Sequence, residues 1–212
     1  MKQGKFITIE GVEGVGKSTQ LEYLQEHLRS LDIDFILTRE PGGTFYAEQI
    51  RDVLLKINEE TLDPIAELLL VFAARAQHLG KLIKPTLARG TWVLCDRFTD
   101  ATYAYQGAGR NLGRKLVAQL ETLVQGELRP DLTLILDLDP EIGLQRATER
   151  GELDRFETEQ LDFFNRVREA YLELAASASE RYRVINAGQD VAAVRSELVA
   201  SVDDWLQGQP HQ

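Results

Sequence analysis

The chain has one cysteine, one methionine and no long hydrophobic run. A single cysteine, Cys95, cannot form a disulfide within the chain, which indicates a reducing compartment. The uncharged apolar run at 68–74 is far shorter than the roughly 20 residues that a bilayer crossing requires. Glu10 interrupts the first apolar run early, so the N-terminus does not resemble a signal peptide. We therefore expect a cytoplasmic protein with no membrane partner.

Basic residues are also scarce. The chain carries 24 Lys and Arg against 34 Asp and Glu, a formal net charge of −10 over 212 residues. Such a field repels nucleic acid over most of the surface, so we expect no nucleic-acid partner, and an anionic ligand needs a local basic cluster. The hydrophobic content of 43% and the charged content of 27% are typical of a folded chain. This length suits one domain spanning 1–212.

Short β-branched runs alternate with longer helical patterns. The predicted strands are 5–10, 34–38, 91–95, 132–137 and 183–186. The predicted helices cover about 17–31, 45–56, 63–89, 112–128, 141–148, 157–177 and 191–206. Segment 39–44 is rich in Gly and Pro and is expected to be a loop. Strands separated by helices favour an α/β fold with a parallel sheet covered on both faces.

A glycine-rich loop follows the first predicted strand and opens a helix. It matches the G-x4-G-K-[ST] pattern of a P-loop with Gly11, Val12, Glu13, Gly14, Val15, Gly16, Lys17 and Ser18. Its backbone N–H groups and the helix N-terminus favour a phosphate chain. Lys17 is expected to reach the β- and γ-phosphates of ATP, and the Ser18 hydroxyl to bind Mg²⁺, with Thr19 beside it.

Charged residues follow the second and third predicted strands. Asp96 ends the third strand and is expected to hold Mg²⁺ through water, although a surface ion pair with Arg97 is the alternative. Guanidinium groups suit a phosphate monoester, and four of them adjoin these strand ends or the helices nearby. They predict a second anion site away from Lys17, and they are Arg39, Arg51, Arg75 and Arg97.

Taken in order, these segments resemble thymidylate kinases, within the nucleoside monophosphate kinases. The resemblance spans 5 to about 190 and is carried by Glu13, 38–44 (TREPGGT), 73–75 (AAR), 96–97 (DR), 104–107 (AYQG) and 150–155 (RGELDR). It implies a three-layer α/β/α P-loop fold with sheet order 2-3-1-4-5 and a helical lid at about 146–157. It also implies transfer of phosphate from ATP, with Mg²⁺, to dTMP, as a step in dTTP synthesis. The usual assembly is a homodimer, which fits a helix at 63–79 that is apolar on more than one face.

The resemblance also assigns roles around dTMP. Arg97 holds the acceptor phosphate, Glu13 contacts the 3′-hydroxyl of the deoxyribose, and Tyr105 blocks a ribose 2′-hydroxyl. Thr102 and Arg75 read the thymine edge, and a charge such as Arg75 inside an apolar helix needs a partner or a ligand. The remaining residues implied at this site are Arg39, Pro41, Arg51, Gln106 and Phe72. Phe72 is the candidate for stacking on the base, because Val71 stands where the family usually has an aromatic residue.

The resemblance assigns catalysis to Lys17, Arg97 and Arg150. Family members that carry an arginine in the P-loop place it after the carboxylate, where this chain has Gly14. The chain therefore resembles the bacterial type with the catalytic arginine in the lid. Arg150 is expected at the transferring phosphate and Arg146 on the adenine. Arg155 is expected either to assist or to pair with a neighbouring carboxylate.

Two other functions share the P-loop. Another nucleotide or deoxynucleoside kinase has the same fold, but a deoxynucleoside kinase needs no pocket for an acceptor phosphate. A P-loop regulatory ATPase would not need the pocket around Tyr105 and Gln106. Both remain open on the P-loop alone, whereas the arginines after the strands favour the monophosphate kinase.

Overall fold

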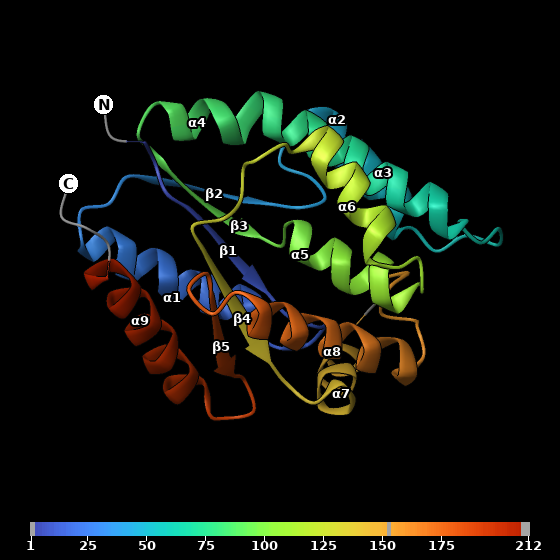
Figure 1. The fold of residues 1–212 in the computed structure, drawn as a ribbon. Helices are drawn as coiled ribbons and strands as arrows, with labels where there is room; N and C mark the ends of the chain where they lie inside the picture. Colours follow the sequence, from blue (N-terminus) through green and yellow to red (C-terminus); the bar gives the residue numbers. More distant parts are fainter. Residues whose placement is uncertain (1–2, 152–153, 209–212) are drawn as a thin grey trace.

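The computed structural model describes residues 3–151 and 154–208. At its centre is a five-stranded parallel sheet in the order β2-β3-β1-β4-β5 (Figure 1). The strands are β1 (Phe6–Glu10), β2 (Phe35–Arg39), β3 (Trp92–Asp96), β4 (Leu132–Asp137) and β5 (Tyr182–Asn186). The predicted sheet and its order are confirmed. Arg39, predicted to begin the loop, is the last residue of β2.

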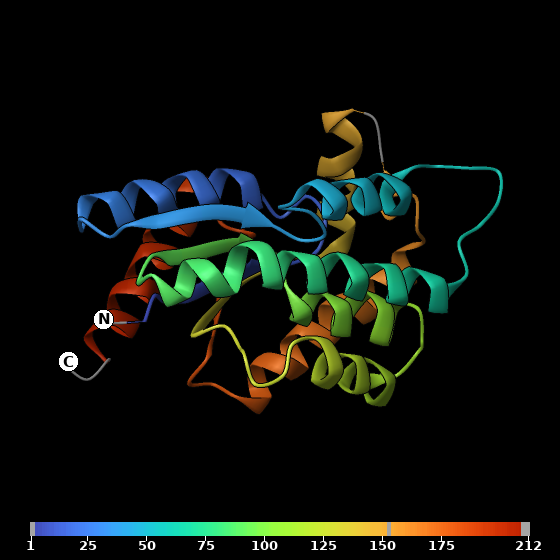
Figure 2. The ribbon, with the colours of Figure 1, turned by 90° about the horizontal axis from the view of Figure 1, so that it is seen from above.

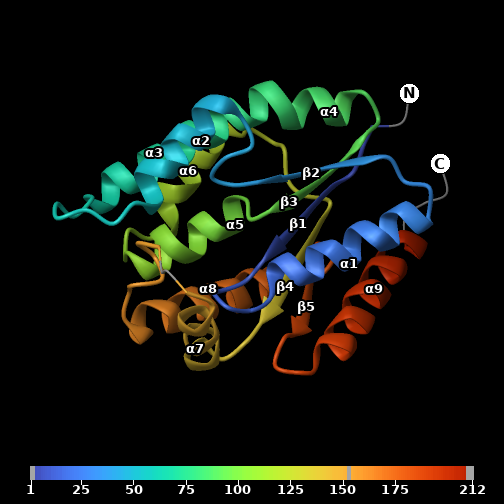
Figure 3. The same ribbon diagram turned by 180° about the vertical axis from the view of Figure 1, so that it is seen from behind.

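Helices cover both faces of the sheet. Helices α1 (Lys17–Ser30) and α9 (Val191–Gln207) pack on one face (Figure 3). Figure 2 shows the layers edge-on, with α1 on one side of the strands and most of the other helices on the opposite side. The remaining helices are α2 (Phe45–Leu55), α3 (Pro64–His78), α4 (Lys84–Ala88), α5 (Thr99–Thr102), α6 (Arg114–Val124), α7 (Pro140–Arg150) and α8 (Leu161–Ser177), with π-helical segments η1 (Leu79–Ile83) and η2 (Tyr103–Gly109). Of these, α7 lies at the carboxyl edge of the sheet.

The predicted helix at 63–89 is continuous, although its middle widens into η1. Asp63 caps it, because its Oδ1 accepts hydrogen bonds from the backbone N–H groups of Ile65 at 2.8 Å and Ala66 at 3.3 Å. Pro64 occupies the first helical position, where its missing N–H costs nothing.

The helix formed by α5 and η2 was not predicted. Segment 99–109 contains Thr, Tyr and Gly, which are weak helix formers, so tertiary packing decides its structure. Gly109 shows how: a Cβ there would lie 2.5 Å from Cε2 of Phe163 on α8. The glycine that disfavours a helix locally is the residue that allows η2 to pack against α8.

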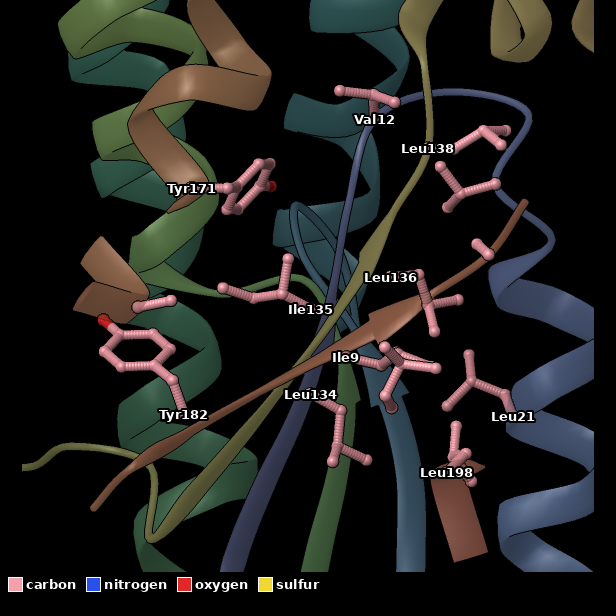
Figure 4. Close-up of a cluster of buried hydrophobic side chains, with 14 of the residues drawn as sticks. Ile9, Val12, Leu21, Leu134, Ile135, Leu136, Leu138, Tyr171, Tyr182 and Leu198 are labelled. Atoms are coloured by element: carbon pink, nitrogen blue, oxygen red, sulfur yellow. The ribbon is translucent and has the colours of Figure 1, made fainter. Parts of the chain in front are cut away.

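The hydrophobic core lies on both faces of the sheet, because successive side chains of a strand point to opposite faces. In β4, Leu134 and Leu136 point toward α1 and α9, whereas Ile135 points toward Tyr171 of α8 (Figure 4). All three side chains are buried, so this strand supports both layers at once. Among the described helices, none has the length and the hydropathy that a membrane crossing requires.

The parallel strands bring four loops to one edge of the sheet. The P-loop follows β1, the segment with Glu40 and Pro41 follows β2, Arg97 follows β3 and α7 follows β4. In Figure 1, α7 stands beyond the arrowhead of β4. Ligands of open α/β sheets bind outside the carboxyl ends of the strands, so this edge is where a site is expected.

Candidate active site

A cleft of about 440 Å³ lies at this edge of the sheet. One wall is the P-loop, the opposite wall comes from α2, α3, α5 and η2, and the third side comes from α7 and the turn that precedes α8. The residues that line it are Glu13, Gly14, Val15, Gly16, Lys17, Ser18, Thr19, Glu40, Pro41, Arg51, Leu55, Val71, Arg75, Asp96, Arg97, Phe98, Ala101, Thr102, Tyr105, Gln106, Arg146, Arg150, Asp154, Phe156 and Glu157.

Lys17 lies over the P-loop backbone. Its Nζ donates hydrogen bonds to the carbonyl oxygens of Gly11 at 3.3 Å and Val12 at 3.2 Å. Burial and the nearby Arg97 lower the pKa of Lys17, and Glu13 opposes that shift. Two cations held this close together favour an anion between them.

Arg97 is held from several sides. Its backbone adopts a left-handed conformation with φ +66°, which is uncommon for a residue with a side chain. Nη1 donates to the carbonyl of Gly11 at 2.8 Å and to the hydroxyl of Tyr171 at 3.3 Å, and Nη2 donates to Oε1 of Glu13 at 2.7 Å. Burial opposes the charge, but Glu13 and Tyr105 raise the pKa of Arg97 well above its ordinary value. The guanidinium is therefore fixed in place and charged.

Glu13 joins the P-loop to Tyr105. The Tyr105 hydroxyl donates to Glu13 Oε1 at 2.9 Å, and the Arg97 guanidinium lies 4.8 Å from the centre of the Tyr105 ring. Burial favours the neutral acid, but Arg97 and Lys17 outweigh it and lower the pKa of Glu13. The structure thus brings together three residues that the sequence predicted from three separate segments.

Sequence reasoning missed the residues that support Arg97 from below. Glu10 ends β1 and is fully buried. Its Oε1 accepts from the backbone N–H of Phe98 at 2.7 Å, and its Oε2 accepts from the hydroxyl of Tyr171 at 2.8 Å. Glu10 therefore holds the backbone that follows Arg97 and, through Tyr171, the guanidinium itself. The acidic end of a buried strand was the only signal for this role.

Burial, followed by the nearby Asp100, raises the pKa of Glu10 to about 8. Between pH 4.5 and 8 the folded protein keeps a proton that the unfolded chain releases, so this group's contribution to stability is lost as the pH rises. Glu10→Gln removes the titration, and its amide can still accept from Phe98 and donate to Tyr171. We expect the variant to gain stability relative to wild type by on the order of a few kcal/mol between pH 5 and 8.5. Urea unfolding at several pH values measures this difference, and parallel curves for the two proteins would contradict it.

Arg75 has the partner that its buried charge requires. It is 2% exposed, its Nε donates to Oε2 of Glu40 at 2.7 Å, and its Nη2 donates to the Thr102 hydroxyl at 3.0 Å. Its buried Nη1 has no hydrogen-bond partner within 3–151 and 154–208, and the residue lines the cleft. Sequence reasoning missed Glu40 and also His78, whose Nδ1 lies 2.9 Å from Oε1 of Glu40.

Two predicted substrate residues do not line the cleft. Phe72 packs in the core with Leu68 and Val117, whereas Val71 faces the cleft. On a helix, neighbouring positions point in different directions, so moving the aromatic by one residue takes it out of the site. Arg39 is exposed and donates to Oε2 of Glu48 at 2.8 Å.

Arg51 and Pro41 do lie at the cleft. Arg51 Nη1 donates to the carbonyl of Pro41 at 2.9 Å. Burial and the nearby Arg39 lower the pKa of Arg51. Arg39 and Arg51 were both implied at the acceptor site, and the structure brings only Arg51 to the cleft.

The predicted Mg²⁺ ligands lie in the same cleft. Oδ1 of Asp96 is buried and has no hydrogen-bond partner in the part of the chain that the structure describes, and Ser18 lines the cleft with it. That part also contains no group of three or more His, Cys, Asp or Glu arranged for a metal. Mg²⁺ usually takes one or two protein oxygens and completes its shell with water and phosphate, so these two residues fit it.

The predicted lid arginines divide into two groups. Arg146 and Arg150 line the cleft, and Nη2 of Arg150 donates to Oε1 of Glu157. Arg155 instead points toward α3, where its Nη2 lies 2.8 Å from Oε2 of Glu67. Within the predicted lid at 146–157, residues 152 and 153 lie outside the described residues.

The fold and the cleft define a class. A P-loop after β1 that shares one cleft with a fixed arginine after β3 is the arrangement of a P-loop nucleoside monophosphate kinase. Comparison with known proteins gives the particular family. The family model described as thymidylate kinase matches residues 9–198.

Individual proteins agree with that match. The thymidylate kinases of Ectopseudomonas mendocina and Teredinibacter turnerae are 59% and 57% identical to this chain, each over 96% of it and over 97% and 99% of their own length. The crystal structure of thymidylate kinase from Ehrlichia chaffeensis superposes with a TM-score of 0.77 at 35% identity, covering 95% of this chain and 99% of that one. The chain belongs to the thymidylate kinase family.

Proposed function

We propose that the P-loop side of the cleft holds ATP, and that the pocket around Arg97 holds dTMP. As a member of its family, the chain phosphorylates dTMP to dTDP with ATP. The observation that carries the residue assignment is the cluster of Arg97, Glu13 and Tyr105, which lies beside the P-loop lysine in one cleft.

On the donor side, the P-loop N–H groups bind the phosphate chain and Lys17 neutralises the β- and γ-phosphates. Ser18 and Asp96 would hold Mg²⁺, with the second contact through water. That ion would shield the charge on the phosphates of the bound nucleotide. Arg146, which lines the same cleft, would stack on the adenine.

On the acceptor side, Arg97 and Arg51 bind the phosphate of dTMP. Glu13 accepts a hydrogen bond from the 3′-hydroxyl, because its carboxylate is ionised and faces the cleft. Tyr105 fills the space that a 2′-hydroxyl would need, and Gln106 lies beside it. The unpaired Nη1 of Arg75 is a hydrogen-bond donor for the thymine edge.

Thr102 supports the base site through Arg75, since its hydroxyl accepts from Nη2 at 3.0 Å. Phe72 lies in the core and Arg39 pairs with Glu48, so neither enters the proposed site. Val71 lines the cleft near Arg75 and is an apolar surface available to the base.

The catalytic arginine belongs to the lid, which we place at 146–157 of a chain that acts as one domain. Position 14 offers no alternative: a Cβ on Gly14 would lie 2.0 Å from the carbonyl oxygen of Gly143, and its φ is +69°. An arginine in the P-loop at this point would displace α7. Arg150 instead faces the cleft from the end of α7, where it can neutralise the transferring phosphoryl group.

Phosphoryl transfer depends on positioning and charge neutralisation rather than on proton transfer. The attacking group is an oxygen of the dTMP phosphate, which is already an anion and needs no general base. Arg97 aims that oxygen, Lys17 and Arg150 neutralise the charge on the transferred phosphoryl group, and closure over the nucleotides excludes water.

The test is an ADP-release assay with ATP, Mg²⁺ and one acceptor at a time. The acceptors are dTMP, dUMP, UMP, dCMP, AMP, thymidine and none. Strong turnover with dTMP, weaker turnover with dUMP and little with UMP would support the phosphate pocket and the Tyr105 gate. Turnover with thymidine at a comparable rate would contradict the role of Arg97. Hydrolysis of ATP without any acceptor would indicate a regulatory ATPase.

We also propose a homodimer that forms through α3 and its neighbours α2 and α6. Helix α3 contacts both α2 and α6 (Figure 2). Each of the three helices exposes large apolar side chains. They are Phe45, Tyr46, Val53, Ile65, Leu69 and Leu123. Analytical ultracentrifugation is expected to show twice the chain mass of 23.9 kDa at micromolar concentration, and Leu69→Glu to shift the protein toward the single chain. A wild-type species at 23.9 kDa would contradict the dimer.

A further inference from the structure

Glu67 is a fully buried carboxylate beneath the acceptor wall of the cleft. It comes from the first turn of α3. Its Oε1 accepts from Nε2 of Gln106 at 2.7 Å, Nε of Arg110 lies 3.3 and 3.2 Å from its two oxygens, and Nη2 of Arg155 lies 2.8 Å from Oε2. One carboxylate therefore joins α3, η2, the residue that follows η2 and the turn before α8.

Arg155 fastens that turn to the end of α2. Its backbone N–H donates to the carbonyl of Leu55 at 3.1 Å, and its Nε donates to the carbonyl of Leu54 at 2.7 Å. Its guanidinium lies 4.5 Å from the ring centre of Phe156. Phe156 lines the cleft and meets Tyr105 edge to face, with ring centres 5.8 Å apart. The contacts of Arg155 thus shape the acceptor pocket without the residue entering it.

The turn at 154–157 connects Arg155 to Arg150. Oδ1 of Asp154 accepts from the backbone N–H of Glu157 at 3.0 Å, and Oε2 of Glu157 accepts from the backbone N–H of Asp154 at 3.0 Å. These reciprocal hydrogen bonds make the turn a stiff unit. The other oxygen of Glu157 accepts from Nη2 of Arg150. The turn therefore contains Arg155 and contacts Arg150 through Glu157.

We propose that Glu67 is a positioning residue that couples acceptor binding at Gln106 to the placement of Arg150. The inference rests on the proposed function, which puts Gln106 beside dTMP and Arg150 beside the transferring phosphate. A nucleotide that fixes Gln106 also fixes the Glu67 carboxylate. Through Arg155 and the turn at 154–157, the Glu67 carboxylate then holds the guanidinium of Arg150 in place on the donor side. Acceptor and donor then each raise the affinity for the other by the same factor.

The experiment measures that factor directly. The Kd of a nonhydrolysable ATP analogue is determined by calorimetry with and without saturating dTMP. Wild type is expected to show a coupling factor of about 5 or more. Glu67→Gln keeps the shape but removes the charge that holds Arg155, and Arg155→Met removes the other partner. Each is expected to lower the factor below about 2, and the double variant to lower it no further, because both act through one contact.

Glu159→Gln is the matched control. Glu159 is the second carboxylate on Arg110, at the rim of the same cluster, and this variant is expected to keep the wild-type factor. A wild-type factor near 1, an unchanged factor in both Glu67→Gln and Arg155→Met, or an equal loss in Glu159→Gln would overturn the proposal. If Glu67→Gln does not fold, Arg155→Met carries the test, because its side chain is 16% exposed. Failure of the proposed residue roles is distinguishable, since Arg150→Ala would then leave kcat unchanged.

Discussion

Arg150→Ala is expected to lower kcat by about a thousandfold, the lower end of the effect of an arginine that neutralises a transferring phosphoryl group. The reason is geometric. Arg150 lines the cleft from the end of α7, and Gly14 leaves no room for an arginine in the P-loop. The KM for dTMP is expected to change by less than about threefold, because an interaction made only in the transition state lowers kcat rather than substrate binding.

Steady-state kinetics with dTMP and ATP varied separately measure kcat and the KM for dTMP independently. Arg195→Ala is the control, because Arg195 lies on α9, is exposed and pairs with Glu26 on α1. It is expected to leave both constants unchanged. An unchanged kcat in Arg150→Ala would remove Arg150 from the reaction, and a large rise in the KM for dTMP would make it an acceptor ligand instead.

Arg97→Gln is expected to lower kcat/KM for dTMP by about 10²- to 10³-fold, the scale of losing one member of a close charge pair. Arg97 lies beside Lys17 in the cleft, since both donate to the carbonyl of Gly11, and its five N–H donors suit a phosphate. Arg97→Lys keeps the charge but lacks the planar fork, so it is expected to recover only part of the loss.

The measurement combines kinetics with binding. Calorimetry is expected to show dTMP binding weakened in Arg97→Gln while binding of an ATP analogue changes by less than about tenfold. The variant also leaves Glu13 without its ion-pair partner, so a thermal melt is needed to show that the protein stays folded. Equal loss of both ligands in a folded protein would contradict an acceptor role.

The sequence was most informative where a function requires a continuous motif. The P-loop is a strand, a glycine turn and a helix, so its residues and their arrangement are readable together. The five strands were likewise recognisable, because each is a short β-branched run between helical patterns. Arg75 was informative for another reason: a guanidinium in an apolar helix implies a partner, and Glu40 is that partner.

The parts of the fold and the site that the sequence did not predict depend on contacts between distant segments. Helix α5–η2 carries Thr102, Tyr105 and Gln106, yet its local sequence disfavours a helix, and packing against Phe163 explains it. Base stacking was assigned to Phe72, but Phe72 is one position along the helix from Val71 and therefore points into the core.

The partners of the lid arginines were also hidden from the sequence. Arg155 was expected to assist the reaction or to pair with a neighbouring carboxylate. Its partner Glu67 lies 88 positions earlier in the chain (155 − 67), and no local pattern signals such a pair. The hydrogen bonds that link Glu10 through Tyr171 to Arg97 also join residues far apart in the chain, so no local pattern predicts them.

The most direct test of the account is a structure of the protein with dTMP, Mg²⁺ and a nonhydrolysable ATP analogue. We expect the analogue's phosphates on the P-loop, the dTMP phosphate within hydrogen-bond distance of the Arg97 guanidinium, and the Arg150 guanidinium at the γ-phosphate with its contact to Glu157 kept. A dTMP phosphate bound away from Arg97, or a γ-phosphate reached by neither Lys17 nor Arg150, would contradict it.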